Sequence, residues 1–333
     1  MDGGPRWDLR SVSTEVIHVR MLIHAGAGNL SRDSDLGRLE PQMLEGLRHA
    51  LRTGHDILRV GGSSLDAVTE AVACLEDNPL YNAGRGSVLT REGRVEMDAA
   101  IMDGRGPRAG AVACVGTIRN PVRAARSVME HSPHVLLVGT GAEAFARDHG
   151  CTLVSPHHFV TPEMYAYWSS LAPSEDPRLE VSAGGTASKR GTVGAVALDQ
   201  QGNVAVATST GGLTRKMPGR VGDSPIPGAG TYACNRSVAV SFTGSGEHLM
   251  RSVAGHRLAA LVEQRGLSLA EAVTVLLGEL TAAGADVGLI ALSPQGGWCI
   301  DFNTTAMLRG VVDAAGTITS AMFIDGPVRR QAG

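Results

Sequence analysis

Apolar and polar positions in the first half of the chain follow both strand and helix periods. An apolar run over 16–24 (VIHVRMLIH) predicts a strand that leads into the glycine-rich stretch Ala25-Gly26-Ala27-Gly28. Leucines spaced three and four residues apart predict a helix over 41–58, and Ser64 is a plausible N-cap for the helix that follows. The same criteria predict strands over 95–102, 110–117 and 134–139 and helices over 121–131 and 140–149.

The stretch from 155 to 190 breaks this regularity. It contains four prolines, many polar residues and Gly184-Gly185, and it shows no sustained apolar period. This composition is typical of an exposed connecting segment. We therefore expect a flexible linker over about 155–191 between two parts of the chain.

The second half opens on a β-hairpin. Apolar runs over 192–199 and 204–210 flank Gln200-Gln201-Gly202-Asn203, a turn that contains glycine. Further strands are predicted over 237–243, 287–293, 298–302 and 317–324, and helices over 247–264 and 268–283. Strands joined by turns and combined with two long helices favour an antiparallel sheet covered by helices, which is an α+β fold.

Composition narrows the functional classes. The 333 residues include 30 basic and 33 acidic side chains, and a formal net charge of −3 argues against a nucleic-acid partner. No apolar run approaches the roughly 18 residues that span a bilayer, and the polar N-terminus is unlike a signal peptide, so we expect a cytoplasmic protein without a membrane partner. The five cysteines are scattered without CxxC spacing, which favours buried thiols over disulfides or a zinc site.

The junction Gly191-Thr192 stands where the predicted linker meets the first strand of the hairpin. A threonine exposed there by chain cleavage would carry a hydroxyl nucleophile and an α-amine. The ordinary pKa of that amine, about 7.7–8.0, lets it accept the proton near neutral pH. Glycine can adopt the strained backbone that attack on its own carbonyl requires. By itself, the dipeptide also fits an ordinary edge-strand threonine after a loop.

Longer motifs around this junction resemble a known family. GTVGAVALD (191–199), GNVAVATSTGGLTRKMPGRVGDSPIPGAGTYA (202–233) and VSFTGSGE (240–247) are similar to segments of the plant-type L-asparaginases and isoaspartyl peptidases, which are N-terminal nucleophile (Ntn) hydrolases. HAGAG (24–28), LEDNPLYNAGRGSVLTREGRVEMDAAIMDG (75–104) and VMEHSPHVLLVGTGAEAFA (128–146) resemble the same family in the same order. Several long motifs in register, over about 20–325, are more specific than any short pattern.

The resemblance implies a fold and a maturation step. The fold would be a four-layer αββα sandwich, the Ntn-hydrolase fold, built as one domain from a precursor that cleaves itself before Thr192. The products would be an α subunit of 1–191, which carries the linker, and a β subunit of 192–333. The family also implies a homodimer of such αβ units and no organic cofactor. Residues 1–15 precede the resemblance.

The resemblance also assigns residues that handle the substrate. Thr192 matches the nucleophile, and Thr210 matches a second threonine that contacts it. Arg220 and Asp223 match the residues that hold the substrate's α-carboxylate and α-ammonium, roles that suit a planar cation and a carboxylate. Without the family, Arg220 and Asp223 fit a surface salt bridge between near neighbours, and Thr210 fits a turn threonine bonded to its own backbone.

The loop Thr243-Gly244-Ser245-Gly246 matches the family segment that contacts substrate and stabilises the tetrahedral intermediate. The hydroxyl of Thr243 and the N–H of Gly244 are suitable oxyanion donors, and the glycines permit close approach of substrate. The loop also fits an ordinary strand-to-helix turn, because Glu247 opens a predicted helix. Asn82 matches an asparagine near the nucleophile that has a positioning role in substrate binding.

Segment 75–85 matches the family's sodium loop, in which main-chain carbonyls coordinate the ion. Its members would be Leu75, Glu76, Asn78, Tyr81, Ala83 and Arg85. Segment 128–139 matches a loop that confers potassium dependence on some members. His24 is expected to be a structural histidine at a strand end. Asp98 and Asp103 fall on opposite faces of a strand and receive no chemical role.

We therefore expect an enzyme that hydrolyses the side-chain amide of L-asparagine and the isopeptide bond of β-aspartyl dipeptides. The alternatives are a glycosylasparaginase or a threonine endopeptidase of the same fold, and a processing-dead relative that serves as a binding scaffold. GTVGAVALD and the PGRVGDSPIPGAG loop look closer to the asparaginase branch, and all the matched functional positions are intact.

Overall fold

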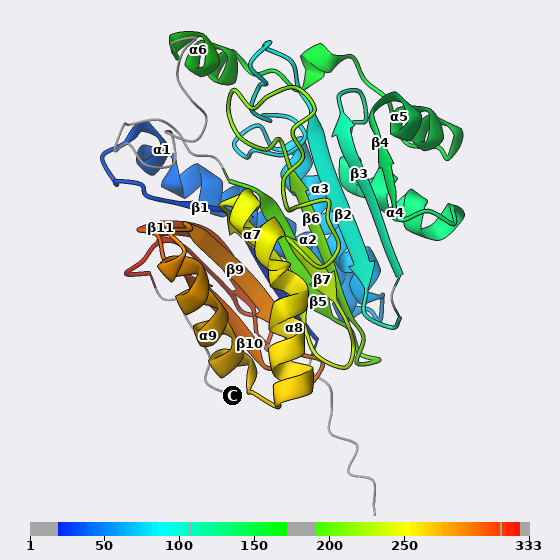
Figure 1. Ribbon diagram of the computed structural model, residues 1–333, viewed down its shortest axis with the longest axis vertical. Coiled ribbons are helices and arrows are strands. Elements are labelled where there is room, and N and C mark those ends of the chain that lie inside the picture. The colour runs from blue at the N-terminus through cyan, green and yellow to red at the C-terminus, as the bar shows by residue number, and fades with distance from the viewer. Residues whose placement is uncertain (1–18, 107, 172–190, 314, 327–333) are drawn as a thin grey trace, which may run out of the picture.

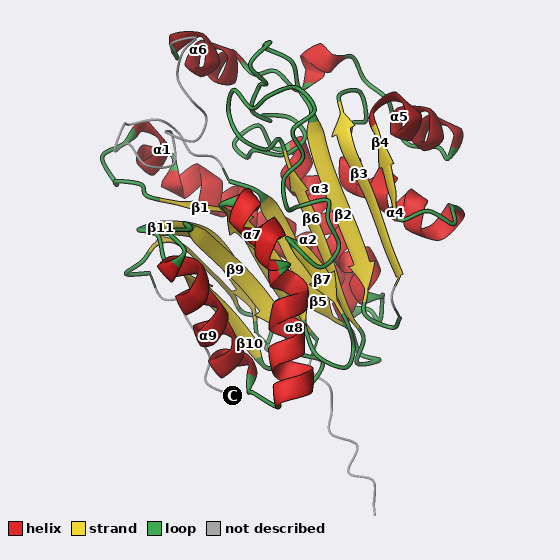
Figure 2. Cartoon of the chain, viewed as in Figure 1, coloured by secondary structure: helices red, strands yellow, loops and turns green. Residues whose placement is uncertain are grey.

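The structure is a computed structural model that describes residues 19–106, 108–171, 191–313 and 315–326. Helices pack on two β-sheets (Figure 1), and Figure 2 shows the helices in red and the strands in yellow. Helices combined with mostly antiparallel sheets confirm the α+β class that the sequence predicts.

The larger sheet has eight strands in the order β12-β11-β1-β5-β6-β2-β3-β4. Neighbouring strands are antiparallel, except that β3 and β4 are parallel. The strands are β1 (Arg20–Gly28), β2 (Met97–Asp103), β3 (Arg108–Val115), β4 (Leu136–Val138), β5 (Val193–Leu198), β6 (Val204–Thr210), β11 (Ala306–Val312) and β12 (Ile318–Phe323). The predicted hairpin of β5 and β6 therefore lies in the middle of the sheet, with β1 on one side and β2 on the other.

The smaller sheet has four antiparallel strands in the order β10-β9-β8-β7. They are β7 (Thr231–Ala233), β8 (Ala239–Gly244), β9 (Val287–Leu292) and β10 (Trp298–Phe302). Strands β8 and β9 contact β1 and β5 of the larger sheet, and β8 and β7 contact β6. The smaller sheet therefore packs on β1, β5 and β6, and Thr192 lies directly before β5.

Helices contact the two sheets separately. α2, α3 and α4 pack on the larger sheet, whereas α8 and α9 pack on the smaller one (Figure 1). The helical segments are α1 (Asp35–Arg38), α2 (Glu40–Arg59), α3 (Ser64–Asp77), α4 (Pro121–His131), α5 (Gly139–Asp148), the 3₁₀ turn η1 (Pro156–His158), α6 (Pro162–Ser170), α7 (Gly246–Ser252), α8 (Ala254–Arg265) and α9 (Leu269–Ala282).

Side-chain alternation along the central strands separates the core into clusters. In β5, Ala195 and Ala197 join the cluster beneath the helices of the larger sheet, whereas Val196 joins a cluster with β8, β9 and β10. In β1, Ile23 joins the cluster beneath the helices, and Leu22 joins the cluster with β8, β9 and β10. Because both faces of these strands are buried, their sequences read as unbroken apolar runs, and this is why the sequence predicts them well.

The expectation of an irregular linker is wrong over its first part. Pro156–His158 and Pro162–Ser170 form the helical segments η1 and α6. Thr161 caps α6 by accepting a hydrogen bond from Met164 N at 3.1 Å, and the side chains of Met164 and Phe159 are buried. A few buried anchors hold this segment, so it needs no long apolar period. The remainder of the predicted linker, 172–190, lies outside the described residues.

Smaller differences have local causes. The helix predicted over 247–264 is divided into α7 and α8 at Val253, whose φ of 49° is left-handed. Ser63, and not Ser64, caps α3 by accepting from Asp66 N at 3.1 Å. Strand β11 was not predicted, because the buried Arg309 and a glycine interrupt its apolar pattern. Strand β7, also not predicted, has only three residues.

Two compositional expectations can be compared with the described residues. None of the helices described is long and apolar enough to cross a membrane. All five cysteines carry free thiols, but only Cys299 is buried, so the prediction of buried thiols is wrong for the other four, which are partly exposed.

Candidate active site

Thr192 lies directly before β5, opposite the end of β6. Its Oγ1 donates a hydrogen bond to Thr210 Oγ1 at 3.2 Å and lies 3.5 Å from Ser224 Oγ. Thr210 Oγ1 also accepts from Gly212 N at 2.9 Å. The predicted contact between the two threonines is therefore present. The antiparallel pairing of β5 with β6 produces it, because Val193 is opposite Ser209.

Gly191 is enclosed by two segments that are distant in sequence. A Cβ on Gly26, whose φ is +109°, would come within 2.6 Å of Gly191 N, so only glycine fits there. The Oγ1 of Thr243 lies 2.9 Å from the position that a Cβ on Gly191 would occupy. This oxygen is buried, and among the described residues it has no hydrogen-bond partner. A free hydroxyl therefore lies beside the Gly191-Thr192 junction.

Gly244 continues the turn at the end of β8. Its φ is +126°, and a Cβ there would overlap the carbonyl oxygen of Asp286. Backbone of this shape favours glycine and brings the chain close to the site. Ser245 lies immediately before the first turn of α7 without forming a side-chain cap. The interpretation of this loop as a strand-to-helix turn is confirmed, while its contact with substrate and its stabilisation of the tetrahedral intermediate stay predictions.

The side chain of Arg220 is only 16% exposed and pairs with a residue that the sequence analysis placed only at a helix start. Its Nε and Nη2 donate to Glu247 Oε1 at 3.0 and 2.9 Å. Within the described residues, the ion pair therefore goes to Glu247 on α7 and not to Asp223. A simple surface salt bridge between Arg220 and Asp223 is thus ruled out.

Asp223 is buried and keeps part of its carboxylate free. Among the described residues, Oδ2 is buried without a hydrogen-bond partner. The pKa of Asp223 is raised to about 7, chiefly by burial; the carboxylates of Glu247 and Asp98 contribute to the rise, while a backbone hydrogen bond and Arg220 oppose it. A buried carboxyl oxygen of this kind is well suited to a small cationic group such as an ammonium.

Asn82 stabilises the backbone next to Thr210. Its Nδ2 donates to Gly212 O at 2.8 Å, and its Oδ1 accepts from Val88 N at 2.9 Å. Because the N–H of Gly212 bonds to Thr210, Asn82 fixes the backbone that orients the second threonine. The role of Asn82 in positioning substrate stays a prediction.

His24 is buried inside β1, and its Nε2 lies 2.8 Å from Ser241 Oγ. Burial lowers the pKa of His24 to about 3, so the ring is neutral at physiological pH and supplies no charge. Asp98 accepts from Cys114 N at 2.9 Å, whereas Asp103 pairs with Arg105 at 2.7 Å. The two aspartates therefore do not form a carboxylate pair, in agreement with the sequence analysis.

The expected sodium loop curls back on itself after α3. The N–H of Arg85 donates to Glu76 O at 2.7 Å, and the carbonyl oxygens of Pro79 and Tyr81 converge on the space beside Gly86. Converging main-chain oxygens are ligands that a hard cation accepts. Of these two carbonyls only that of Tyr81 belongs to the predicted sodium ligands, so the sodium site stays a prediction.

Two residues that lie in the site were not among the predicted site residues. Ser224 lies within 3.5 Å of the Thr192 hydroxyl, and Glu247 holds Arg220. Ser224 follows Asp223 directly, and that adjacency was the available signal. Glu247 is 27 residues from Arg220, so no local spacing indicated their contact.

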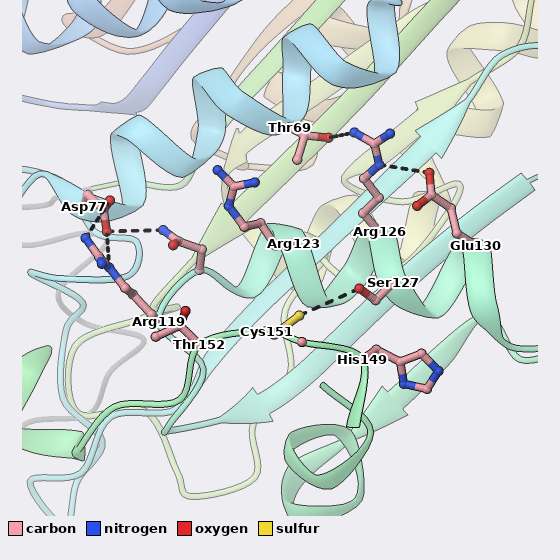
Figure 3. Close-up of a pocket in the computed structure, with 12 residues that line it drawn as sticks. Thr69, Asp77, Arg119, Arg123, Arg126, Ser127, Glu130, His149, Cys151 and Thr152 are labelled. Carbon is pink, nitrogen blue, oxygen red and sulfur yellow. Dashed lines mark hydrogen bonds and ion pairs between the residues drawn. The ribbon is translucent and has the colours of Figure 1, made fainter. Parts of the chain in front are cut away.

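A separate cavity of about 500 Å³ opens beside α3 and α4 (Figure 3). We call it the arginine-lined cavity, because Arg119, Arg123 and Arg126 all line it. Each arginine is paired with an acid, as shown by Arg123 with Glu70 at 2.7 Å. None of the cavity's lining residues belongs to the cluster around Thr192, which we call the threonine site.

Comparison with known proteins identifies the family. A family model described as asparaginase matches residues 17–322, so the chain belongs to this asparaginase family. It is 48% identical over 304 residues to an isoaspartyl peptidase of Salmonella typhimurium, covering 90% of this chain and 97% of that protein. It is also 48% identical over 306 residues to an isoaspartyl peptidase of Escherichia coli, covering 90% and 95%. An isoaspartyl peptidase/L-asparaginase of Danio rerio is 43% identical over 289 residues, covering 86% and 90%.

Proposed function

We propose that this chain is a self-processing hydrolase that uses Thr192 to cleave the side-chain amide of L-asparagine and the isopeptide bond of β-aspartyl dipeptides. Its relatives named isoaspartyl peptidase and isoaspartyl peptidase/L-asparaginase support this substrate class. The observation that carries the proposal is the contact of Thr192 Oγ1 with Thr210, beside a glycine that faces the free hydroxyl of Thr243.

The proposed fold is the four-layer αββα sandwich of Ntn hydrolases. The separate contacts of α2, α3 and α4 with one sheet, and of α8 and α9 with the other, support it. Cleavage before Thr192 would give subunits of 1–191 and 192–333 that remain one folded domain. Two such units would form a homodimer, which light scattering of the processed protein would measure.

The first step would be self-cleavage. Thr192 Oγ1 adds to the carbonyl carbon of Gly191, the C–N bond breaks, and the nitrogen takes the hydroxyl proton, so that an ester replaces the amide. Water then hydrolyses the ester, which leaves a Gly191 carboxylate and a free Thr192 amine and hydroxyl. The Thr243 hydroxyl, which lies 2.9 Å from the position of a Cβ on Gly191, would stabilise the oxyanion that forms on the Gly191 carbonyl.

The released amine would then serve catalysis. Before cleavage the nitrogen of Thr192 is an amide and cannot accept a proton, so self-cleavage creates the general base. The Thr192 hydroxyl attacks the substrate's side-chain carbonyl, and the amine transfers the proton to ammonia or to the departing peptide amine. Water hydrolyses the β-aspartyl ester that remains. Thr243 Oγ1 and Gly244 N–H would bind the oxyanion in both steps.

Substrate orientation would come from two charges. The guanidinium of Arg220 would bind the α-carboxylate, although it already donates to Glu247 and therefore must share or exchange that contact. The free Oδ2 of Asp223 would accept the α-ammonium. Both groups must be free in the substrate, which limits hydrolysis to aspartyl residues attached through their side chain.

The loop over 75–85 would hold a sodium ion through main-chain oxygens, beside the backbone that carries Asn82. The ion would stabilise this loop and would take no part in the reaction. The melting temperature should then be higher in sodium chloride than in choline chloride of equal concentration. Equal melting temperatures in the two salts would reject the site.

A substrate panel tests the proposed function. Purified protein should release aspartate from L-asparagine and from β-aspartyl-leucine, and it should leave α-aspartyl-leucine and N-acetyl-β-aspartyl-leucine intact. Preferential cleavage of glycosylated asparagine would indicate a glycosylasparaginase. Cleavage of the N-acetylated dipeptide would indicate an endopeptidase, and binding without hydrolysis would indicate a scaffold.

A further inference from the structure

The loop over 211–220 connects two parts of the threonine site. At its start, the N–H of Gly212 donates to Thr210 Oγ1 at 2.9 Å, and at its end lies Arg220. The shape of this loop therefore affects the partner of the nucleophile and the cation proposed to bind the substrate. Arg215 lies in the middle of the loop. Within the described residues its hydrogen bonds go neither to Thr210 nor to Arg220.

Arg215 has an unusual backbone and environment. Its φ is +57°, in the left-handed region that side chains other than glycine rarely adopt, and only 7% of the residue is exposed. Its N–H donates to Leu89 O at 2.7 Å. A strained residue of this kind persists only where the surrounding structure holds it, and such residues cluster at functional sites.

The guanidinium of Arg215 bonds to the C-terminal end of α6. Its Nη1 donates to Leu171 O at 2.6 Å and to Trp168 O at 3.4 Å, and its Cζ lies 5.6 Å from the centre of the Trp168 ring. Carbonyls at a helix C-terminus attract a cation, which makes this pairing favourable. Trp168 Nε1 donates to Thr90 O at 2.9 Å, beside the Leu89 carbonyl that Arg215 also uses.

We propose that Arg215 is a positioning residue that ties the substrate-binding loop to α6, so that substrate affinity depends on this helix. The proposal rests on the proposed function for its kinetic readout. After cleavage between Gly191 and Thr192, α6 would belong to one subunit and Arg215 to the other. The contact would then hold α6 of the α subunit on the loop of the β subunit.

Other contacts predict which kinetic constant responds. Lys216 Nζ donates to Glu96 O at 2.7 Å, and Gly219 N donates to Glu96 Oε2 at 2.8 Å. These bonds hold the end of the loop nearest Arg220 when Arg215 is lost. The loop would therefore remain folded but sample a wider range of positions, which weakens substrate binding more than it slows the chemical steps at Thr192.

The test compares Arg215→Asn and Arg215→Gly with wild-type protein. Asparagine and glycine tolerate positive φ, so both variants remove the guanidinium without adding backbone strain. Arg236→Asn is the matched control, because Arg236 is an exposed arginine paired with Glu263 at 2.8 Å. Each protein is assayed for subunit formation, for kcat and KM with β-aspartyl-leucine, and for chymotryptic cleavage within α6 after Tyr165 or Trp168, identified by mass spectrometry.

Both Arg215 variants should form two subunits, raise KM by about 5- to 20-fold with kcat within about twofold, and be cut faster in α6. The control should match wild type.

An unchanged KM would overturn the proposal, whether or not α6 is cut faster. A fall in kcat alone would also overturn it. If wild type does not hydrolyse the dipeptide, the proposed function fails; the rate of cutting in α6 still tests the tie, and an unchanged rate overturns it.

If neither variant is soluble, Arg215→Lys and Trp168→Phe replace them. Each keeps most of the volume of its side chain, but Arg215→Lys loses part of the bonding to α6 and Trp168→Phe loses the bond to the Thr90 carbonyl. Both should raise KM in the same way by a smaller factor of about 2 to 5. An unchanged KM in both variants would overturn the proposal.

Discussion

The arginine-lined cavity and the threonine site are both rich in polar groups, but those groups are partnered differently. In the cavity, Arg123 makes two hydrogen bonds to Glu70, at 2.8 and 2.7 Å, and both side chains are partly exposed. In the threonine site, Thr243 Oγ1 and Asp223 Oδ2 are buried without a hydrogen-bond partner among the described residues. The arginine-lined cavity is hollow, but its charged groups are paired. The threonine site contains buried polar atoms that have no partner among the described residues.

This difference shows where chemistry is to be sought. A buried polar atom without a partner costs free energy, so a protein retains one where binding or catalysis uses it. Paired charges on a helix surface stabilise their own contact and need no ligand. The arginine-lined cavity therefore gives no indication of the threonine site, whereas two of the buried atoms without a partner lie in it; others, such as Trp298 Nε1, lie elsewhere.

The largest expected effect is that of Thr192→Ala. This variant lacks the hydroxyl that attacks Gly191, so it should remain a single chain and show no turnover of β-aspartyl-leucine. Thr192→Ser is the matched control, because it keeps a hydroxyl and should still be cut, although more slowly. Gel electrophoresis and an aspartate-release assay measure both outcomes. Full turnover by the uncut alanine variant would remove the threonine site from the mechanism.

Thr243→Val should have the next largest effect. It keeps the shape of the side chain but removes the proposed oxyanion donor, so kcat should fall by roughly 10²-fold with a smaller change in KM. Self-cleavage should slow as well, and kcat must therefore be calculated from the fraction of chain that is cut. Thr243→Ser should recover most of the rate. A change in KM alone would reassign Thr243 to ground-state binding.

The titration of Asp223 predicts a stability that varies with pH. Burial raises the pKa of Asp223 to about 7 from its ordinary 3.8. Between about pH 4 and 7 the folded protein therefore keeps a proton that the unfolded chain has released, and the free energy of unfolding falls as pH rises through this range.

Asp223→Asn removes this titration. The difference in unfolding free energy between wild type and the variant should fall by about 1 to 4 kcal/mol from pH 4 to pH 7. Urea unfolding at a series of pH values measures it. A difference that does not vary with pH would show that Asp223 is not held in its protonated form, and a rise with pH would reverse the predicted sign.

The smallest effect is expected in the arginine-lined cavity. Arg123→Gln removes one partly exposed ion pair, which should lower the free energy of unfolding by at most about 1 kcal/mol and leave kcat and KM unchanged. Thermal unfolding and the dipeptide assay measure the two properties. A tenfold loss of activity would mean that the cavity, and not only the threonine site, takes part in the reaction.

The sequence predicted the parts of the fold that have strong periods or long apolar runs. The hairpin of β5 and β6 and the helices α2 and α4 are present close to their predicted bounds. Helix α6 was missed because it is held by a few buried anchors and by polar bonds such as that of Trp168 to Thr90. Those contacts depend on residues far away in the chain, which no local pattern contains.

The candidate site was predictable to a similar degree. Long motifs led to Thr192, Thr210 and Thr243, and the structure brings the first two into hydrogen-bond contact and the third beside Gly191. The pairing of Arg220 with Glu247 depends on how the loop before β7 packs on α7. The free oxygen of Asp223 likewise depends on three-dimensional packing, so neither feature could be predicted from spacing.

Capture of the acyl-enzyme is the decisive measurement. Processed protein is mixed with β-aspartyl-leucine, quenched in acid within milliseconds and digested, and the peptide that begins Thr-Val-Gly-Ala-Val is examined by mass spectrometry. A β-aspartyl ester on the hydroxyl of Thr192, absent from samples without substrate, is the expected result. An ester on another residue, or turnover by a chain whose Gly191-Thr192 bond is intact, would contradict the assignment of Thr192 as the nucleophile.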